Sequence, residues 1–459
     1  MERGIQEPAA VESLIDIANR DSNAEFEVKL LAGKIQTRDV AERLLKAIET
    51  MSVGEFVEEH RLTYSFPEGM RVSVVDPQNI HKICVSQSFK GLPVLVERKV
   101  KYFDSTAGRD MVDAPEVLTR FTLRSEKPIK KDFDGDVNDP KAHIRVLHRK
   151  SYKLEGGEFR VDFSMVKSRI GKQTLREVLK NVPGYEFEIE YLPRKPARKA
   201  SEVRESLYRI CETILQAYLE SAAILLQSEI QKYSQEFKFT GIRFYNIVSM
   251  DRVHISPDRP NNILKGYTVT NKADGIRAGL YVARDRKLLR ISRGGEHIAW
   301  TGLIAVDDKH AEDFLDGEFI ENKNLFCIFD VFRYKNKDVK ALPLFTTDED
   351  IRANPGSSRL GCAREFVKTM NTDFRTVVSG FRVETKLFLA GDGPAMEEAI
   401  QTLLDTEFEY HTDGLIFTPR SSPVMPPTES KGKTWLRVYK WKPPHMILRH
   451  LIHALLHLN

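Results

Sequence analysis

Charged and apolar residues alternate strictly along much of the first half of the chain. In residues 24–30, AEFEVKL, a period of two places Glu25, Glu27 and Lys29 on one face of a strand and apolar side chains on the other. The same alternation recurs in residues 94–103, 120–127, 143–152, 158–166 and 185–192. A sheet with one face in water explains a single strand of this kind equally well. Its recurrence predicts a strand-rich domain with a charged face on every strand.

The pattern changes at residues 192–205, LPRKPARKASEVRE, where two prolines and a basic run predict a linker. Apolar residues then recur at helical spacing to about residue 230, which predicts one long amphipathic helix. Strands resume beyond it and include YTVTNKADGIRAGL, residues 267–280. Within this segment Asp274-Gly275 predicts a tight hairpin turn, with Lys272 at the end of the preceding strand.

Composition narrows the class of protein. The 459 residues are enough for two to three domains, and the 70 basic and 66 acidic residues give a net charge of only +4. A general nucleic-acid coat would be more basic, so any polyanion must bind at local patches. The four cysteines lie far apart with no CxxC pair, which predicts free thiols in a reducing compartment. We expect neither a signal peptide nor a membrane span.

The first and last alternating strands each carry neighbouring carboxylates on one face. Residues 185–192, YEFEIEYL, place Glu186, Glu188 and Glu190 together, as Glu25 and Glu27 are on the first strand. Two like charges 4 Å apart cost about 4 kcal/mol at an effective dielectric constant of 20, so a cation is expected between them. Mg²⁺ and Mn²⁺ prefer such oxygen ligands, and the arginines and lysines of the intervening strands suit a polyphosphate.

These glutamate strands resemble the opening ExExK and closing ExExE strands of the triphosphate tunnel metalloenzymes, over roughly residues 20–195. The resemblance implies a closed antiparallel barrel with polar side chains inside. It also implies removal of the γ-phosphate from RNA 5′-triphosphate ends. The metal, Mg²⁺ or Mn²⁺, would be held by Glu25, Glu27, Glu188 and Glu190, with Glu186 as a catalytic base. The residues that we expect to contact the RNA triphosphate are Lys29, Arg124, Arg149 and Arg160.

Short charged segments flanked by apolar strands follow one another through the second half. Each one alone is typical of a turn or a strand end. In chain order they are KADGIR (272–277), RISRGG (290–295), LDGEF (315–319), IFDVF (328–332), DGLIF (413–417) and VYKWKP (438–443). All but RISRGG resemble motifs I, III, IIIa, IV and V of the covalent nucleotidyltransferases, which include mRNA guanylyltransferases and ATP-dependent ligases. The resemblance spans roughly residues 240–445, and the Trp-Lys-Pro ending favours guanylyltransferases.

This second resemblance implies a reactive lysine. Lys272 would attack the α-phosphate of GTP, form a phosphoramidate with GMP and release pyrophosphate. The amine must lose its proton to do so, and we expect cationic neighbours that favour the neutral form. The nucleotide-binding residues would be Arg277, Arg293, Glu318, Phe329 and Asp413, and Lys440 and Lys442 would stabilise charge on the α-phosphate.

The expected fold class is therefore α+β. A closed antiparallel β tunnel with flanking helices is expected over residues 1–195, a linker and helix over 196–235, an ATP-grasp-like nucleotidyltransferase domain over 236–445 and a tail over 446–459. This tail follows motif V directly, so we expect no C-terminal OB domain. We expect a partner subunit or another chain segment to supply that lid and a methyltransferase.

The two halves together predict mRNA 5′ capping by a triphosphatase and guanylyltransferase. The expected partners are 5′-triphosphate RNA and GTP. The layout is similar to the capping enzymes of large DNA viruses, which implies the cytoplasm, a virion or a viral factory. Two alternatives are also consistent with the sequence. One is an ATP-dependent polynucleotide ligase, and the other is a triphosphatase whose truncated, inactive transferase domain binds RNA ends or a partner.

Overall fold

The computed structural model describes residues 1–30, 37–52, 54–102, 109–129, 133–256, 258–259, 262–292, 295 and 297–443. The chain divides into two compact units near Ser221, and each is described by itself. The helix expected as part of a linker over residues 196–235 is α5 (Ala200–Leu219), and it belongs to the first unit. No helix in the described part of the chain is long and apolar enough to cross a membrane.

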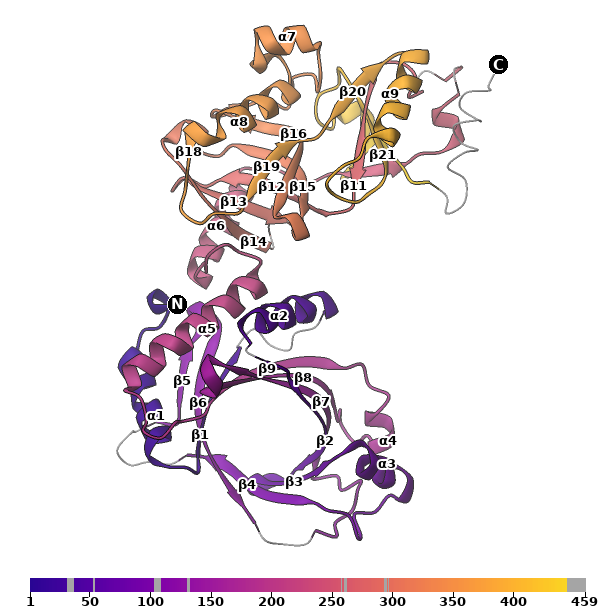
Figure 1. The fold of residues 1–459 in the computed structure, drawn as a ribbon. Helices are drawn as coiled ribbons and strands as arrows, with labels where there is room; N and C mark the ends of the chain where they lie inside the picture. The colour runs from indigo at the N-terminus through magenta and orange to yellow at the C-terminus, as the bar shows by residue number, and fades with distance from the viewer. Residues whose placement is uncertain are drawn as a thin grey trace. The chain divides into compact units, whose positions relative to one another are not determined.

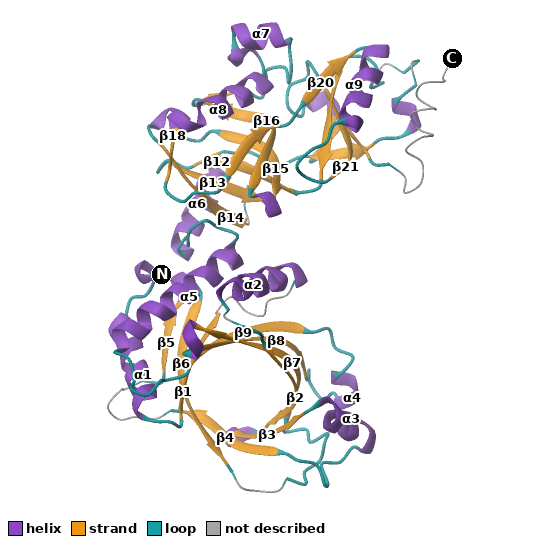
Figure 2. Ribbon diagram, viewed as in Figure 1, coloured by secondary structure: helices purple, strands orange, loops and turns teal. Residues whose placement is uncertain are grey.

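The first unit is built on a closed antiparallel barrel (Figures 1 and 2). Among the described residues the order around the ring is β1-β9-β8-β7-β2-β3-β4-β6, and β6 pairs with β1 to close it. The strands of the ring are β1 (Ala24–Leu30), β2 (Val57–Ser65), β3 (Met70–Val75), β4 (Leu95–Lys101), β6 (Thr119–Pro128), β7 (His143–Leu154), β8 (Phe159–Ser168) and β9 (Gly184–Tyr191). A short strand, β5 (Met111–Ala114), pairs with β6 outside the ring. The expected closed β tunnel is confirmed.

Helices pack on the outside of the barrel, where they cover apolar side chains of its strands. They are α1 (Pro8–Arg20), α2 (Arg38–Met51), α3 (Pro77–Ser86), α4 (Leu175–Val178) and α5. Leu62 and Tyr64 of β2 pack with Ile83 of α3 in one apolar cluster, and Phe121 of β6 packs against Tyr208 of α5. Because side chains alternate along a strand, the charged residues between these apolar ones face the barrel interior.

The predicted long helix after the linker is interrupted. Helix α5 ends at Leu219, and Glu220 takes a left-handed conformation with φ of 49°. A second helix, α6 (Gln227–Phe239), begins only later and lies mostly in the second unit. Ser221 and Leu225, which continue the helical spacing in the sequence, lie between the two helices and are buried there, so the apolar spacing does not reveal the break.

The second unit holds two sheets with helices packed on them (Figure 2). The strands of the first are β10 (Asn246–Ser249), β11 (Tyr267–Ala273), β20 (Phe388–Gly391), β21 (Thr412–Pro419), β22 (Ser430–Lys431) and β23 (Thr434–Trp441). Those of the second are β12 (Ile276–Val282), β13 (Lys287–Ser292), β14 (His297–Ala305), β15 (Phe314–Ile320), β16 (Leu325–Tyr334), β17 (Lys337–Asp338), β18 (Phe374–Thr376) and β19 (Arg382–Thr385). With its helices, the unit confirms the expected α+β class.

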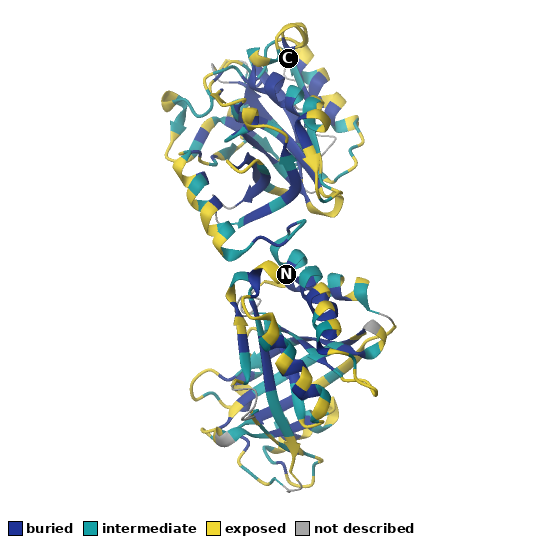
Figure 3. Cartoon of the chain, turned by 90° about the vertical axis from the view of Figure 1, so that its left-hand side faces the viewer, coloured by how far each residue is buried: buried dark blue, intermediate teal, exposed yellow. Residues whose placement is uncertain are grey.

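Each sheet is covered by its own helix. Met396 and Leu403 of α9 (Pro394–Asp405) share an apolar cluster with residues of β11, β21 and β23. Phe366 of α8 (Arg359–Asp373) packs into the core formed by β12 to β16. A short helix, α7 (Asp348–Ala353), precedes α8. Buried residues follow the strands of each unit in Figure 3, where they are dark blue.

The KADG segment connects these two sheets. Strand β11, which ends at Ala273, pairs with β20 and β21, whereas β12, which starts at Ile276, pairs with β13 and β15. The prediction of a hairpin turn at Asp274-Gly275 was therefore wrong. Gly275 is needed for space, because a Cβ there would lie 2.7 Å from the carbonyl oxygen of Phe319. A local Asp-Gly pair indicates a change of direction but not which strands the change connects.

A buried histidine ties α8 to this second sheet. His310 Nδ1 lies 2.7 Å from Asp313 Oδ2, and its Nε2 lies 3.0 Å from Asp373 Oδ2 at the end of α8. Burial disfavours the charged ring, but the bonds to both carboxylates outweigh it and raise the pKa of His310. The imidazolium therefore stabilises the fold.

We expect this stabilisation to depend on pH. It is present in full below about pH 6.5, the usual pKa of an unfolded histidine, and it is lost as the pH rises through the higher pKa of the folded state. His310→Gln should lower the free energy of unfolding by about 1–3 kcal/mol at low pH and reduce its pH dependence. Urea unfolding of both chains at several pH values checks this, with His81→Gln on the surface of α3 as control. An unchanged pH dependence in His310→Gln would contradict the assignment.

Candidate active sites

Lys99 of β4 lies among carboxylates inside the barrel. Its Nζ is 2.5 Å from Glu25 Oε2, 2.7 Å from Glu27 Oε1 and 2.7 Å from Glu126 Oε1. Both β4 and β1 pair with β6, and Lys99 stands directly opposite Glu126 in this register. The fold thus brings the predicted metal ligands Glu25 and Glu27 together around an ammonium group to which the sequence pattern assigned no role.

Strand β9 brings the other predicted metal ligands to the same interior. Lys29 Nζ joins the two strands, at 2.9 Å from Glu27 Oε2 and 2.7 Å from Glu188 Oε1. Glu190 is paired with Arg160 of β8. The predicted metal ligands of both strands therefore face the interior, and each is paired with a cation of the chain.

Glu25 and Glu27 differ in how their charge is compensated. Burial raises the pKa of Glu25 to about 9, and the negative charge of Glu27 adds to this rise. Burial acts on Glu27 too, but the ammonium groups of Lys99 and Lys29 outweigh it and lower the pKa of this carboxyl to about 2. The difference follows from the contacts, because Glu27 touches both ammonium groups and Glu25 touches only Lys99. Further positive charge at this cluster would favour the ionised form of Glu25.

The predicted triphosphate contacts also lie on interior-facing positions. Arg149 Nη1 is 2.9 Å from Asp162 Oδ2, and Lys29 and Arg160 make the pairs described above. Arg124 stands opposite Glu25 in the register of β1 and β6, but its guanidinium bonds Asp110 Oδ2 at 2.5 Å. A polyanion inside the barrel would have to compete with these carboxylates.

Glu186, the predicted base, is bonded by Arg145 of β7. Several other charged residues occupy the same interior face but were not assigned to the site. They are Glu59, Arg61, Arg71, Glu97, Lys99, Glu126, Arg145 and Asp162. The signal that could have found them is the alternation itself, continued around all strands of the ring.

The donor set of the barrel has the chemistry of a site for a hard cation, because its groups are carboxylate oxygens. The ammonium of Lys99 stands as a cation among three of these carboxylates. No group of three or more histidine, cysteine, aspartate or glutamate side chains in the described part of the chain is arranged to hold a metal ion. The carboxylates therefore fit Mg²⁺ or Mn²⁺ by their chemistry but not by their present arrangement, in which the Nζ of Lys99 lies among the oxygens of Glu25, Glu27 and Glu126.

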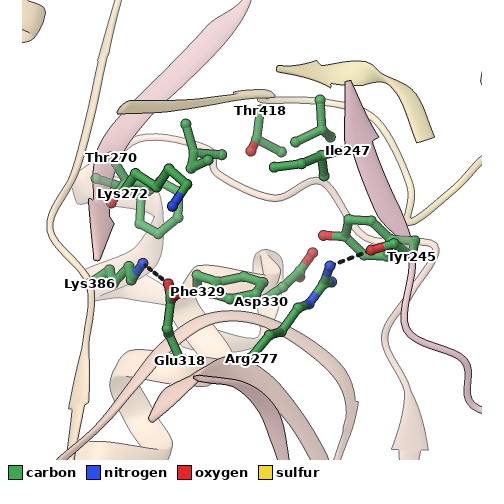
Figure 4. A pocket seen from close by; sticks show the side chains of 13 residues that line it. Tyr245, Ile247, Thr270, Lys272, Arg277, Glu318, Phe329, Asp330, Lys386 and Thr418 are labelled. Atoms are coloured by element: carbon green, nitrogen blue, oxygen red, sulfur yellow. Dashed lines mark hydrogen bonds and ion pairs between the residues drawn. The ribbon is translucent and has the colours of Figure 1, made fainter. Parts of the chain in front are cut away.

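A pocket in the second unit gathers residues of both its sheets (Figure 4). Its lining residues are Tyr245, Ile247, Thr270, Lys272, Arg277, Glu318, Phe329, Asp330, Lys386, Phe388, Ile416, Thr418 and Val438. Lys272 comes from the end of β11, whereas Arg277, Glu318 and Phe329 come from β12, β15 and β16. The crossover at Asp274-Gly275 therefore places the candidate nucleophile opposite the candidate nucleotide-binding residues.

Asp413 lies between two lysines at the start of β21. Its Oδ1 is 2.6 Å from Lys272 Nζ, and its Oδ2 is 2.5 Å from Lys442 Nζ. Burial would raise the pKa of Asp413, but the bonds from both lysines outweigh it and lower the pKa. The Lys272 amine is thus held by a carboxylate at 2.6 Å. Lys442 Nζ, one of the expected cationic neighbours, lies on the other oxygen of the same carboxylate, and the role of these neighbours in deprotonating Lys272 stays a prediction.

The DG pair that carries Asp413 is sterically restricted. Gly414 has φ of 146°, and a Cβ there would lie 1.9 Å from the carbonyl oxygen of Trp441. This close approach brings β21 against the end of β23, which carries the second lysine pair. Lys440 stands opposite Ile416 and shares a strand face with Val438, and both of these neighbours line the pocket. Lys440 is therefore near the pocket but does not line it.

The remaining predicted nucleotide-binding residues are held by partners. Arg277 bonds the buried Asp316 at 2.6 Å, and its guanidinium lies 5.4 Å from the centre of the Phe329 ring. Glu318 Oε2 accepts from Lys386 Nζ at 3.0 Å, as Figure 4 shows. Arg293 lies outside the described residues.

Lys386 was missed by the sequence analysis. Its side chain is 2% exposed, and its Nζ lies 5.5 Å from the centre of the Phe329 ring. It stands between β19 of the second sheet and β20 of the first, where the chain crosses back between the sheets. No motif marked it, because a lysine in VETKLFLAG looks like an ordinary strand residue.

Residues 218–444 match the family model described as mRNA capping enzyme, catalytic domain. The second unit is similar to that domain. A search of curated proteins finds no match to the chain. Among solved structures, the Mimivirus capping enzyme triphosphatase is 14% identical, covers 46% of this chain and 97% of that chain, and has a TM-score of 0.35. The S. pombe RNA triphosphatase is 12% identical, covers 44% of this chain and 83% of that chain, and has a TM-score of 0.29.

Proposed function

We propose that the chain caps mRNA with two activities. The first unit removes the γ-phosphate from the 5′-triphosphate end of RNA. The second transfers GMP from GTP, through a covalent bond to Lys272, to the diphosphate end so produced. The observation that carries this proposal is the pocket that joins the Lys272 amine to Arg277, Glu318 and Phe329, within the residues that match the capping-enzyme family. We further propose that it acts in the cytoplasm or a viral factory.

The chemistry at Lys272 is a substitution at the α-phosphorus. A bond forms between Nζ and phosphorus, the bond from phosphorus to the bridging oxygen breaks, and pyrophosphate leaves. Asp413, at 2.6 Å from Nζ, is the nearest base for the proton that the ammonium must release. Lys442, on the other oxygen of Asp413, and Lys440 supply positive charge for the phosphates.

In the barrel, the chain supplies both carboxylates and cations. Glu25, Glu27, Glu188 and Glu190 would hold Mg²⁺ or Mn²⁺, which when bound supplies positive charge that stabilises the transferring phosphoryl group. The predicted contacts Lys29, Arg124, Arg149 and Arg160 would bind the triphosphate in exchange for their present carboxylate partners. Glu186 is the group that we assign to orienting or deprotonating the attacking water.

Two labelled substrates test the proposal. The full chain, incubated with α-³²P-GTP and a divalent metal, should acquire a covalent label that survives denaturing electrophoresis. RNA with a γ-³²P-labelled 5′ end should release inorganic phosphate. A label from ATP and not from GTP would assign the second unit to the ligases. Phosphate release without any covalent label would leave a triphosphatase whose second unit is a scaffold.

Lys386 gives a reason to prefer GTP. An ammonium group beside the ring of Phe329 can donate to the O6 and N7 acceptors of a guanine stacked there, whereas adenine presents an amino group at the same edge. We expect Lys386→Met to reduce the preference for GTP over ATP by about tenfold or more. Rates of covalent labelling with each nucleotide measure this, with the exposed Lys323→Met as control. Equal losses for both nucleotides would instead assign Lys386 to holding Glu318.

A further inference from the structure

The ammonium of Lys99 lies at the centre of an acidic cluster formed by Glu25, Glu27 and Glu126. The proposed chemistry assigns no role to this ammonium. It touches three carboxylates at 2.5–2.7 Å, and its side chain is only 14% exposed. Two of these carboxylates, Glu25 and Glu27, are the first pair of proposed metal ligands. The ammonium of Lys99 and a metal ion would therefore bind the same carboxylate oxygens of Glu25 and Glu27.

We propose that Lys99 is a built-in competitor of the metal, and that a divalent ion binds to the barrel only by displacing its ammonium from Glu25 and Glu27. This inference rests on the proposed function, which assigns these glutamates to the metal. An ammonium and a metal ion of like charge repel strongly at contact distance, so they cannot share the same oxygens. Lys99 thereby keeps the cluster compensated without metal and lowers the metal affinity that the carboxylates alone would have.

The contacts distinguish Lys99 from its neighbours. Lys29 touches Glu27 and Glu188, and its side chain is 39% exposed. Arg71 touches Glu126 at 3.3 Å and Glu97 at 3.2 Å. Within the described part of the chain, Lys99 is the cation that bonds both Glu25 and Glu27. Its removal should therefore affect metal affinity more than removal of another interior charge.

Manganese binding to the full chain tests this directly. Calorimetric titration with Mn²⁺ alone gives the affinity, and the barrel site is the one that Glu27→Gln abolishes. We expect Lys99→Gln to bind Mn²⁺ at this site about tenfold more tightly than the wild type. The matched control, Arg71→Gln, removes a neighbouring interior charge that does not touch Glu25 or Glu27, and should change the affinity by less than about threefold.

The outcomes separate this inference from the proposed function. The role of Lys99 is overturned if the wild type binds Mn²⁺ in the barrel and Lys99→Gln binds it no more tightly. It is also overturned if Arg71→Gln tightens Mn²⁺ binding as much as Lys99→Gln does. In both cases the metal assignment remains intact. If neither the wild type nor Lys99→Gln binds Mn²⁺ in the barrel, the proposed metal site itself fails, and the inference fails with it.

A second measurement needs no variant of the cluster. Acetylation of the wild-type chain by an N-hydroxysuccinimide ester, read out by mass spectrometry, reports how accessible each amine is. We expect saturating Mn²⁺ to raise labelling of Lys99 several-fold. Lys150, whose Nζ lies 4.5 Å from the centre of the Phe56 ring, faces the opposite side of the wall from Arg149 and should be unaffected. Unchanged labelling of Lys99 with the barrel site filled overturns the proposal.

Discussion

Lys272→Arg is expected to abolish the covalent GMP label. A guanidinium keeps the positive charge and can still bond Asp413, but it cannot be deprotonated to act as a nucleophile. We expect labelling by α-³²P-GTP to fall by more than about 10⁴-fold, because loss of the attacking group removes the reaction and does not merely weaken binding. Electrophoresis of the labelled chain measures this.

Two controls make the result specific. Lys265→Arg changes an exposed lysine of the same unit and should label as the wild type does. Release of γ-phosphate from RNA by Lys272→Arg should be unchanged, because the barrel lies in the other compact unit. A label that persists in Lys272→Arg would show that another residue is the nucleophile, and peptide mapping would identify it.

Glu27→Gln is expected to reduce release of the RNA γ-phosphate by at least about 10²-fold. Glu27 is 3% exposed and contacts both Lys99 and Lys29. Its negative charge therefore holds two ammonium groups in place, in addition to its proposed role as a metal ligand. Glutamine keeps the shape but not the charge, and losses of this size are typical when a preorganised charge is removed from a phosphoryl-transfer site. The rate of phosphate release under multiple turnover measures the effect.

The matched control for this change is Glu58→Gln. Glu58 lies on the same barrel, on the opposite face of β2 from the interior residues, where it bonds His148 at 2.5 Å. We expect nearly wild-type phosphate release from it, and a normal GMP label from both variants. Wild-type activity in Glu27→Gln would remove this glutamate from the proposed site.

The sequence predicted the barrel well because alternation is a direct property of strands. Glu25, Glu27 and Lys29 face inward as their spacing requires, and the charged strands do close into a ring. Which charges meet inside depended on register, and that information is not local. Lys99 and Glu25 are 74 positions apart and become partners only because β4 and β1 both pair with β6.

In the pocket of the second unit, too, the sequence predicted individual residues but not all of the contacts that the fold creates. Motif order was sufficient to find Lys272, Glu318 and Phe329, which line one pocket. The hairpin prediction failed because Asp274-Gly275 carries no information about which sheet follows it. Lys386 lies in no motif, and only the fold shows it beside Phe329.

The chain passes between the two sheets of the second unit twice within the described residues, once after Lys272 and once at Lys386. These crossings are also in contact, because Lys386 Nζ lies 3.4 Å from the carbonyl oxygen of Asn271. Lys272, the proposed nucleophile, and Lys386, the proposed contact to guanine, thus stand at the two places where the chain passes from one sheet to the other. Any movement of one sheet relative to the other must bend the chain at both crossings. The position of Lys386 beside a bound guanine and the position of the Lys272 amine would therefore change together.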